Sequence, residues 1–265
     1  MTSYRYLRNG DEKMQRKDYI NLKQDEAFEQ YKRGVLFQED IESVYDEIDY
    51  KIKLPDLLGK TVRVTDMQFP ELYRMLHEIC EKESMECPAV YVYEDYYYGA
   101  ESYGINNPWI ELSAKTIQDF SKEELRFVLA REIYKIVDGV TRQRTMMEER
   151  FKVIQGVAPD QLEKISRLSF YHWYRLANYT ADNYGYLSCG SIKSSVKAIL
   201  LMVLNSRLLV DHTNVKEFIA QASEINRLDD GVFNYTKADE SVPYAPHRIQ
   251  SLLAYAVSER GMQNK

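Results

Sequence analysis

Apolar side chains recur at helical intervals through most of this chain, and residues 121–136 show the pattern most clearly. Their apolar positions lie three and four residues apart and form one stripe of an amphipathic helix. Ser121 is a good N-cap, and Glu124 follows it at the spacing of a capping box. The pattern predicts a helix that either ends at Gly139 or continues through Met147. The stripe consists of Leu125, Val128, Leu129, Ile133 and Ile136.

The remaining segments divide into further helices and a few short strands. Residues 60–64 alternate between polar and apolar, and residues 89–93 and 109–112 are rich in β-branched and aromatic side chains, as strands are. Residues 96–103, which are rich in tyrosine, fit neither pattern clearly. Many helices and one small mixed sheet beside the 121–136 helix predict an α+β fold. The other helices are predicted within 18–50, 69–80, 168–182 (ending near Gly185), 191–209, 215–225 and 246–258.

The composition is that of an ordinary globular protein, with 265 residues, 45% hydrophobic and 29% charged. A net charge of −6 provides no general attraction to nucleic acid or to anionic membranes. The most apolar run, 198–210, is too short and too polar to span a bilayer, and the first residues do not form a signal peptide. Three cysteines without a C-x-x-C pair favour a reducing compartment, so we expect a cytoplasmic protein.

The 121–136 helix contains an unusual pentapeptide, Arg131-Glu132-Ile133-Tyr134-Lys135. It has the layout of H-E-x-x-H, in which two histidines one turn apart bind zinc and the glutamate activates a water molecule. Here both histidine positions are cationic. Arg131 and Lys135 share one face of the helix just after an apolar segment, where an unpaired charge is costly. The alternative is that both side chains simply reach solvent.

Four further segments allow a family to be named. Together with residues 123–135, and in the same order along the chain, they resemble the soluble catalytic domain of the HtpX-like zinc metallopeptidases, relatives of the CAAX prenyl proteases. Residues 123–135 resemble E-L-x-x-V-L-x-H-E-x-x-H, and residues 175–182 resemble R-x-x-E-x-x-A-D, whose glutamate is the third zinc ligand. The resemblance implies a zincin-like fold. The other matching segments are 69–73 with 87–92, 99–104 with 109–112, and 241–252.

The departures from the family pattern fall on its metal site. Arg131 and Lys135 stand at the two histidine positions, Asn178 stands at the third-ligand position, and Val242 replaces a histidine of the last motif. Arginine and lysine offer no lone pair to a metal at neutral pH. The resemblance therefore implies that zinc is absent and that Glu132 is a remnant general base with no metal-bound water to activate.

The same resemblance brings the two helices that carry these residues together. We therefore predict that Arg131 or Lys135 contacts Asp182 or Glu132 across the helices, where a cation takes the charge position of the lost zinc. Asp182, Val242 and Arg248 stand at positions that surround the ligands in the family. The alternative is drift, with both cations extended into solvent.

Three functions remain open from the sequence. The first is an inactive metallopeptidase homologue that binds a peptide or protein through the remnant cleft, beside an edge strand. The second is an active zinc endopeptidase with displaced ligands from His172, His212 or His247, and the third is another enzyme with Glu132, Asp182 and Lys135 as acid and base groups. In the first, the groove is lined by Tyr96, Tyr97, Tyr98 and Tyr103; these tyrosines alternatively pack under a loop.

The chain divides into three parts by this interpretation. Residues 1–60 form a helical extension, residues 61–258 form the zincin-like domain, and residues 259–265 form a short tail. We expect neither a nucleic-acid partner nor a membrane span.

Overall fold

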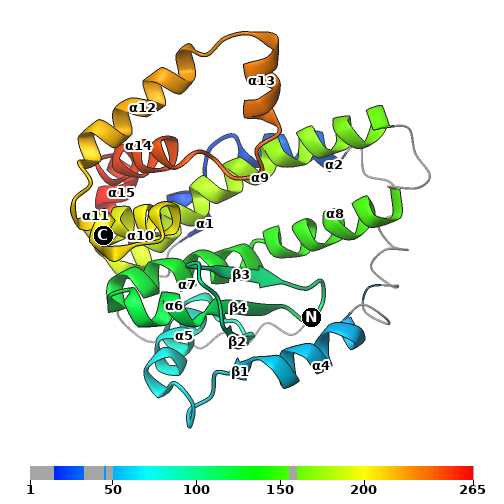
Figure 1. Cartoon of the computed structure of the whole chain (residues 1–265), viewed down its shortest axis with the longest axis vertical. Helices are drawn as coiled ribbons and strands as arrows, with labels where there is room; N and C mark the ends of the chain where they lie inside the picture. The colour runs from blue at the N-terminus through cyan, green and yellow to red at the C-terminus, as the bar shows by residue number, and fades with distance from the viewer. Residues whose placement is uncertain (1–14, 33–44, 46–49, 155–159, 265) are drawn as a thin grey trace.

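The computed structural model describes residues 15–32, 45, 50–154 and 160–264. Its elements form an α+β fold that is mostly helical, with one small mixed sheet (Figure 1). The predicted helical region 18–50 is therefore described only in part, and the start of the chain, where no signal peptide was expected, lies outside the described residues. None of the described helices has the length and apolar character needed to cross a membrane.

The sheet has four strands in the order β1-β2-β4-β3. The two central strands, β2 and β4, run parallel with Val90 opposite Ile110, while β1 and β3 pair antiparallel at the two edges. The predicted strands at 89–93 and 109–112 are confirmed, and the ambiguous stretch 96–103 contains the edge strand β3. The strands are β1 (Val62–Arg63), β2 (Ala89–Tyr93), β3 (Ala100–Tyr103) and β4 (Trp109–Ser113).

Helices account for the rest of the described elements. The N-terminal segment contributes α1 (Arg16–Tyr19), α2 (Gln24–Lys32) and α4 (Tyr50–Lys60), and α5 (Pro70–Glu83) precedes β2. After the sheet come α6 (Ala114–Asp119), α7 (Lys122–Val137), α8 (Val140–Ile154) and α9 (Asp160–Cys189). The C-terminal part contains α10 (Ile192–Leu204), α11 (Arg207–Asp211), α12 (Val215–Arg227), α13 (Gly231–Ala238), α14 (Ala245–Ala256) and α15 (Glu259–Gln263).

The predicted helix over 121–136 is α7, and its start is the predicted capping box. The Ser121 hydroxyl accepts from the Glu124 amide at 3.3 Å, and the Glu124 carboxylate accepts from the Ser121 amide at 2.7 Å. Gly139, with a φ of 73°, separates α7 from α8, so the helix ends before this residue instead of continuing through Met147. A positive φ is inexpensive only for glycine, which explains why the break falls there.

Two predicted helix boundaries were wrong. The single helix expected over 191–209 is two helices, because Asn205 adopts a left-handed conformation (φ 51°) and Ser206 caps α11. The helix expected to end near Gly185 continues to Cys189 as part of a 30-residue α9. In both places the local composition predicted the wrong boundary. Asn205 ends a helix although it lies within an apolar run, and Gly185 lies inside a helix although glycine commonly marks a helix end.

The main core lies between α7, α9, α10 and one side of the sheet. Val90, Val92, Ile110 and Leu112 point to this side and join the buried residues of α7 and α9 in one cluster. The alternate strand positions, including Tyr91 and Trp109, point to the other side and pack with Leu57 of α4 in a second, smaller cluster. The sheet therefore has two different environments, one facing α7 and one facing α4. In Figure 1, α7 lies beside β3 and α4 lies near β1.

Candidate functional site

Three charged residues of α7, all within the pentapeptide that resembles H-E-x-x-H, point into the protein. Arg131, Glu132 and Lys135 are each at most 6% exposed, although they carry full charges. The capped start of α7 and its apolar stripe set the rotation of the helix, and this rotation turns Arg131 and Lys135 toward the interior.

A close approach of α7 and α9 brings the two helices to contact distance. A Cβ atom at Gly185 of α9 would lie 2.8 Å from Cδ2 of Phe127 and 2.9 Å from its carbonyl oxygen. A glycine inside a helix costs about 0.5–1 kcal/mol relative to alanine. Here it allows the backbone of α9 to approach α7 one turn away from Arg131, whose Cγ would lie 3.0 Å from the same added atom.

Asp182 of α9 forms ion pairs with two arginines from different helices. The Arg131 Nε atom lies 2.7 Å from Asp182 Oδ1, and Arg248 of α14 donates from Nη2 and Nε to the two carboxylate oxygens at 2.7 and 2.9 Å. The predicted contact between a cation of α7 and Asp182 is thereby confirmed. Asn178 also participates, because its Oδ1 accepts from Arg131 Nη2 at 3.1 Å while its Nδ2 donates to the Tyr174 carbonyl.

Glu132 is fully buried and has partners on both carboxylate oxygens. Oε1 lies 2.8 Å from Lys135 Nζ, and Oε2 accepts from the amide and the hydroxyl of Ser102 at 2.9 and 2.8 Å. Ser102, on the edge strand β3, also shares a hydrogen bond with the hydroxyl of Thr141 in α8. Because of these contacts, Glu132 ties β3 and α7 together. We call Arg131, Glu132, Lys135, Asp182 and Arg248 the ion-pair cluster.

Electrostatics keep both carboxylates of the ion-pair cluster ionised. Burial by itself raises the pKa of Asp182, but the guanidinium groups of Arg248 and Arg131 outweigh it and hold that pKa below its ordinary value. Burial likewise raises the pKa of Glu132, and the nearby Lys135 and Arg131 outweigh it and lower the pKa. Asp182 in turn raises the pKa of Arg248 despite burial. Neither carboxylate carries a proton to donate near neutral pH.

These residues do not fit a zinc ion. Arg131 and Lys135 carry only hydrogen-bond donors, and both point at carboxylates. The ion-pair cluster contains three cations and two carboxylates, so its formal charge is already positive and opposes a further cation. Among the residues that the structure describes, no three His, Cys, Asp or Glu side chains come together in a way that could hold a metal ion.

The three histidines proposed as alternative ligands, and Val242, lie in other environments. His172 and His212 are exposed, and His247 contacts Asn226 Oδ1 at 3.0 Å. Val242 is 38% exposed in the segment before α14. Of the three residues expected to surround the family's ligands, Asp182 and Arg248 are therefore members of the ion-pair cluster.

The outer edge of β3 is covered where it passes the ion-pair cluster. The Ser102 amide donates to Glu132, and the Gly104 amide donates to the Thr145 hydroxyl of α8 at 3.2 Å. An added strand needs such outward-facing amides for its own hydrogen bonds. At these two residues the edge is already occupied by side chains of the same chain.

The four tyrosines of the proposed groove do not share one surface. Tyr96 and Tyr97 are 83% and 67% exposed, whereas Tyr98 is buried in the main core and donates to Asp119 Oδ2 at 2.7 Å. Tyr103 stacks on Trp109 on the α4 side of the sheet, with 5.8 Å between ring centroids. The structure thus supports the packing alternative for Tyr98 and Tyr103, and leaves Tyr96 and Tyr97 on the surface.

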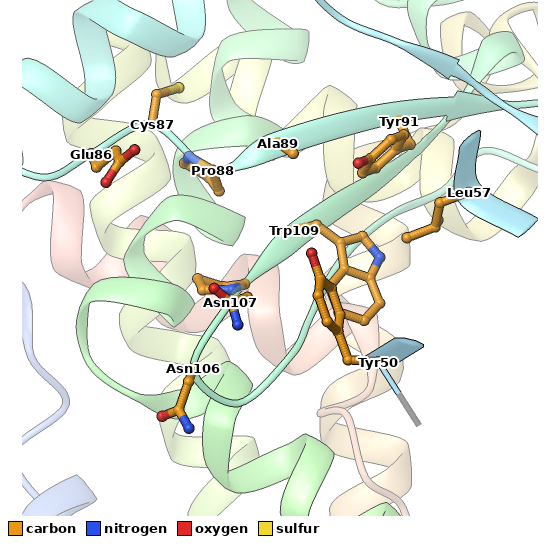
Figure 2. Close-up of a pocket in the computed structure, with 11 residues that line it drawn as sticks. Tyr50, Leu57, Glu86, Cys87, Pro88, Ala89, Tyr91, Asn106, Asn107 and Trp109 are labelled. Carbon is orange, nitrogen blue, oxygen red and sulfur yellow. The ribbon is translucent and has the colours of Figure 1, made fainter. Parts of the chain in front are cut away.

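A pocket that the sequence analysis missed lies on the α4 side of the sheet, with a volume of about 340 Å³. Its aromatic residues are Tyr50 of α4, Tyr91 of β2 and Trp109 of β4 (Figure 2). These three residues are far apart in the sequence, and no motif links them. Ser102 was also missed, although it stands within residues 99–104, which were matched to the family's edge strand.

Comparison of this chain with protein-family models, with curated proteins and with solved structures finds no match.

Proposed function

We propose that this chain is a catalytically inactive metallopeptidase homologue with a zincin-like fold, which binds a peptide or protein. The observation that carries the proposal is the inward pairing of Arg131 with Asp182 and of Lys135 with Glu132. Cations left there by drift would extend into solvent, because burying an unpaired charge costs several kcal/mol. The paired cations suit a scaffold that has exchanged its metal for an internal ion network.

The state of Glu132 supports the absence of catalysis. A general base must be reachable from the substrate and must have an unoccupied lone pair for the proton it removes. Glu132 is 0% exposed, and both of its oxygens already accept from Lys135 or Ser102. The same burial argues against an acid–base enzyme built on Glu132, Asp182 and Lys135.

Because the edge of β3 is covered, it is excluded as the surface that binds the peptide or protein. Because the outward amides of Ser102 and Gly104 are engaged, we place the peptide or protein ligand at the exposed tyrosines Tyr96 and Tyr97, just before β3. Exposed tyrosines suit recognition because they bury a large area and lose little conformational entropy.

Metal analysis tests the proposal that the chain is an inactive homologue without zinc. After equilibration with zinc and gel filtration, the wild-type protein and the Arg131→His variant are expected to carry no stoichiometric zinc, because Lys135 remains. The triple variant with Arg131→His, Lys135→His and Asn178→Glu restores the ligand set and is expected to gain zinc. One tightly held zinc per wild-type chain, together with peptide cleavage that disappears in Glu132→Gln, would establish an active zinc endopeptidase with other ligands.

An NMR titration with a library of extended peptides tests the binding surface. We expect shifts at Tyr96 and Tyr97, and we expect Tyr96→Ala to weaken binding while Tyr93→Phe, a nearby change on β2, does not. Shifts confined to residues remote from β3 would place the ligand elsewhere and overturn this part of the proposal.

A further inference from the structure

The pocket on the α4 side of the sheet has an aromatic end. Tyr91 of β2 and Trp109 of β4 are 5% and 3% exposed, and the centroids of the Tyr50 and Trp109 rings lie 5.7 Å apart. Figure 2 shows Tyr50 and Trp109 on one side of the pocket and Glu86 on the opposite side, beyond Pro88 and Ala89. At about 340 Å³ the volume lies within the range of small-molecule sites.

The charge of the pocket is one-sided. Among the residues that the structure describes, its lining includes one carboxylate, Glu86, and the amides of Asn106 and Asn107, and no lysine, arginine or histidine. Two cationic side chains lie near the pocket, and each already contacts an acceptor of the same chain. Arg142 donates to Asn106 Oδ1 at 2.8 Å, and Lys53 Nζ lies 3.2 Å from Glu111, which accepts from the Trp109 indole.

The two ends of the pocket suit two parts of one ligand. The aromatic end offers apolar contact to the body of a ligand, and the Glu86 carboxylate at the other end attracts a cationic group. We propose that this pocket binds a small organic cation, a primary ammonium on an apolar body, with the apolar body against Tyr50, Tyr91 and Trp109 and the ammonium toward Glu86. This inference is independent of the proposed peptidase ancestry, because the ion-pair cluster lies on the other side of the sheet.

A series of three probes of similar size and different charge tests the proposal. The probes are 2-phenylethylammonium, 2-phenylethanol and phenylacetate, titrated into the full chain at constant ionic strength. The readout is the indole N–H resonance of Trp109, and the resonance of Trp173, buried in the main core, is the internal control. We expect the ammonium probe to bind tightest and phenylacetate weakest, with shifts at Trp109 and none at Trp173.

Two variants distinguish the effect of the Glu86 charge from the effect of filling the pocket. Glu86→Gln should weaken 2-phenylethylammonium about two- to fivefold, as for an exposed ion pair, and leave 2-phenylethanol unchanged. Glu81→Gln, an exposed residue of α5 that does not line the pocket, is the matched control. Ala89→Phe places a ring in the pocket from an exposed position and should abolish binding of all three probes.

Several results would overturn the proposal. They are phenylacetate binding as tightly as the ammonium probe, equal shifts at Trp109 and Trp173, no shift at Trp109 with any probe, or full binding in a folded Ala89→Phe variant. If Ala89→Phe does not fold, the comparison of Glu86→Gln with Glu81→Gln decides, and equal affinities for the ammonium probe in these two variants contradict the assigned role of Glu86.

Discussion

The two sides of the small sheet carry their polar groups in opposite arrangements. On the α7 side, five charged residues are each at most 7% exposed and pair with one another through contacts of 2.7–2.9 Å. On the α4 side, the carboxylate of Glu86 is exposed at the rim of an aromatic pocket. The first arrangement is closed and structural in its effect, and the second leaves space for a ligand.

The difference shows that residue type alone does not identify a functional site. The α7 side carries the residues that resemble a catalytic motif, yet each of its carboxylate oxygens is already bonded within the chain. The α4 side carries no motif, yet it contains a pocket of about 340 Å³ lined in part by Tyr50, Tyr91 and Trp109. Availability to a ligand depends on which hydrogen bonds the fold has already satisfied.

The largest effect is expected from a substitution at Asp182, in the centre of the ion-pair cluster on the α7 side. Asp182→Asn leaves Arg131 and Arg248 buried without their shared counter-charge, so it should lower the free energy of unfolding by about 3–5 kcal/mol. Urea denaturation measures the loss. The control is Asp56→Asn, which removes an exposed pair with Lys60 of α4 and should cost no more than about 1 kcal/mol. Equal losses in the two variants would mean that the ion-pair cluster is not a stabilising network.

Acidic pH should also lower the free energy of unfolding through the ion-pair cluster. The pKa of Asp182 and the pKa of Glu132 lie below their ordinary values in the folded protein. Their contribution to stability is therefore complete above the unfolded values of about 4 and is lost as the pH falls through the lower folded values. Urea denaturation between pH 6 and pH 3 should show this loss, and Asp182→Asn should show a shallower one. Identical slopes in both proteins would contradict the lowered pKa of Asp182.

A pair of glycine substitutions compares packing on the two sides. Gly185→Ala places a Cβ atom 2.8 Å from the Phe127 ring and should cost about 1–3 kcal/mol, because α7 and α9 must separate. Gly59→Ala, near the end of α4, meets nothing within 4 Å and should be neutral or stabilising by up to about 1 kcal/mol. Thermal melting compares the two variants. A neutral Gly185→Ala would show that the two helices can move apart without cost.

The smallest expected effects sharpen the distinction between buried and exposed tyrosines. Tyr98→Phe removes the hydrogen bond to Asp119 and should cost about 1 kcal/mol. Tyr96→Phe, at an 83% exposed position, should change stability by less than about 0.5 kcal/mol. Urea denaturation of both variants tests the assignment, and a larger effect at Tyr96 would reverse it.

Local sequence determined the elements with strong periodicity and clear caps. The start of α7, with its Ser121 and Glu124 capping box, depends only on residues within one turn of each other, so it was predictable from the pattern. The same holds for the shared face of Arg131 and Lys135, since four residues make one helical turn. Their contact with a carboxylate was predicted from the high cost of unpaired buried charge together with the resemblance, which brought the two helices into contact.

Only the tertiary structure decided which groups meet across long sequence separations. Arg248 reaches Asp182 from 66 residues away, and Ser102 reaches Glu132 from a strand on the edge of the sheet. The path of α9 through Gly185 depends on Phe127 of another helix, so composition alone predicted a helix end there. The pocket formed by Tyr50, Tyr91 and Trp109 exists because α4 packs on the outer side of the sheet. Local propensities act over a few residues, whereas these contacts arise from the packing of distant elements, which no single stretch of sequence encodes.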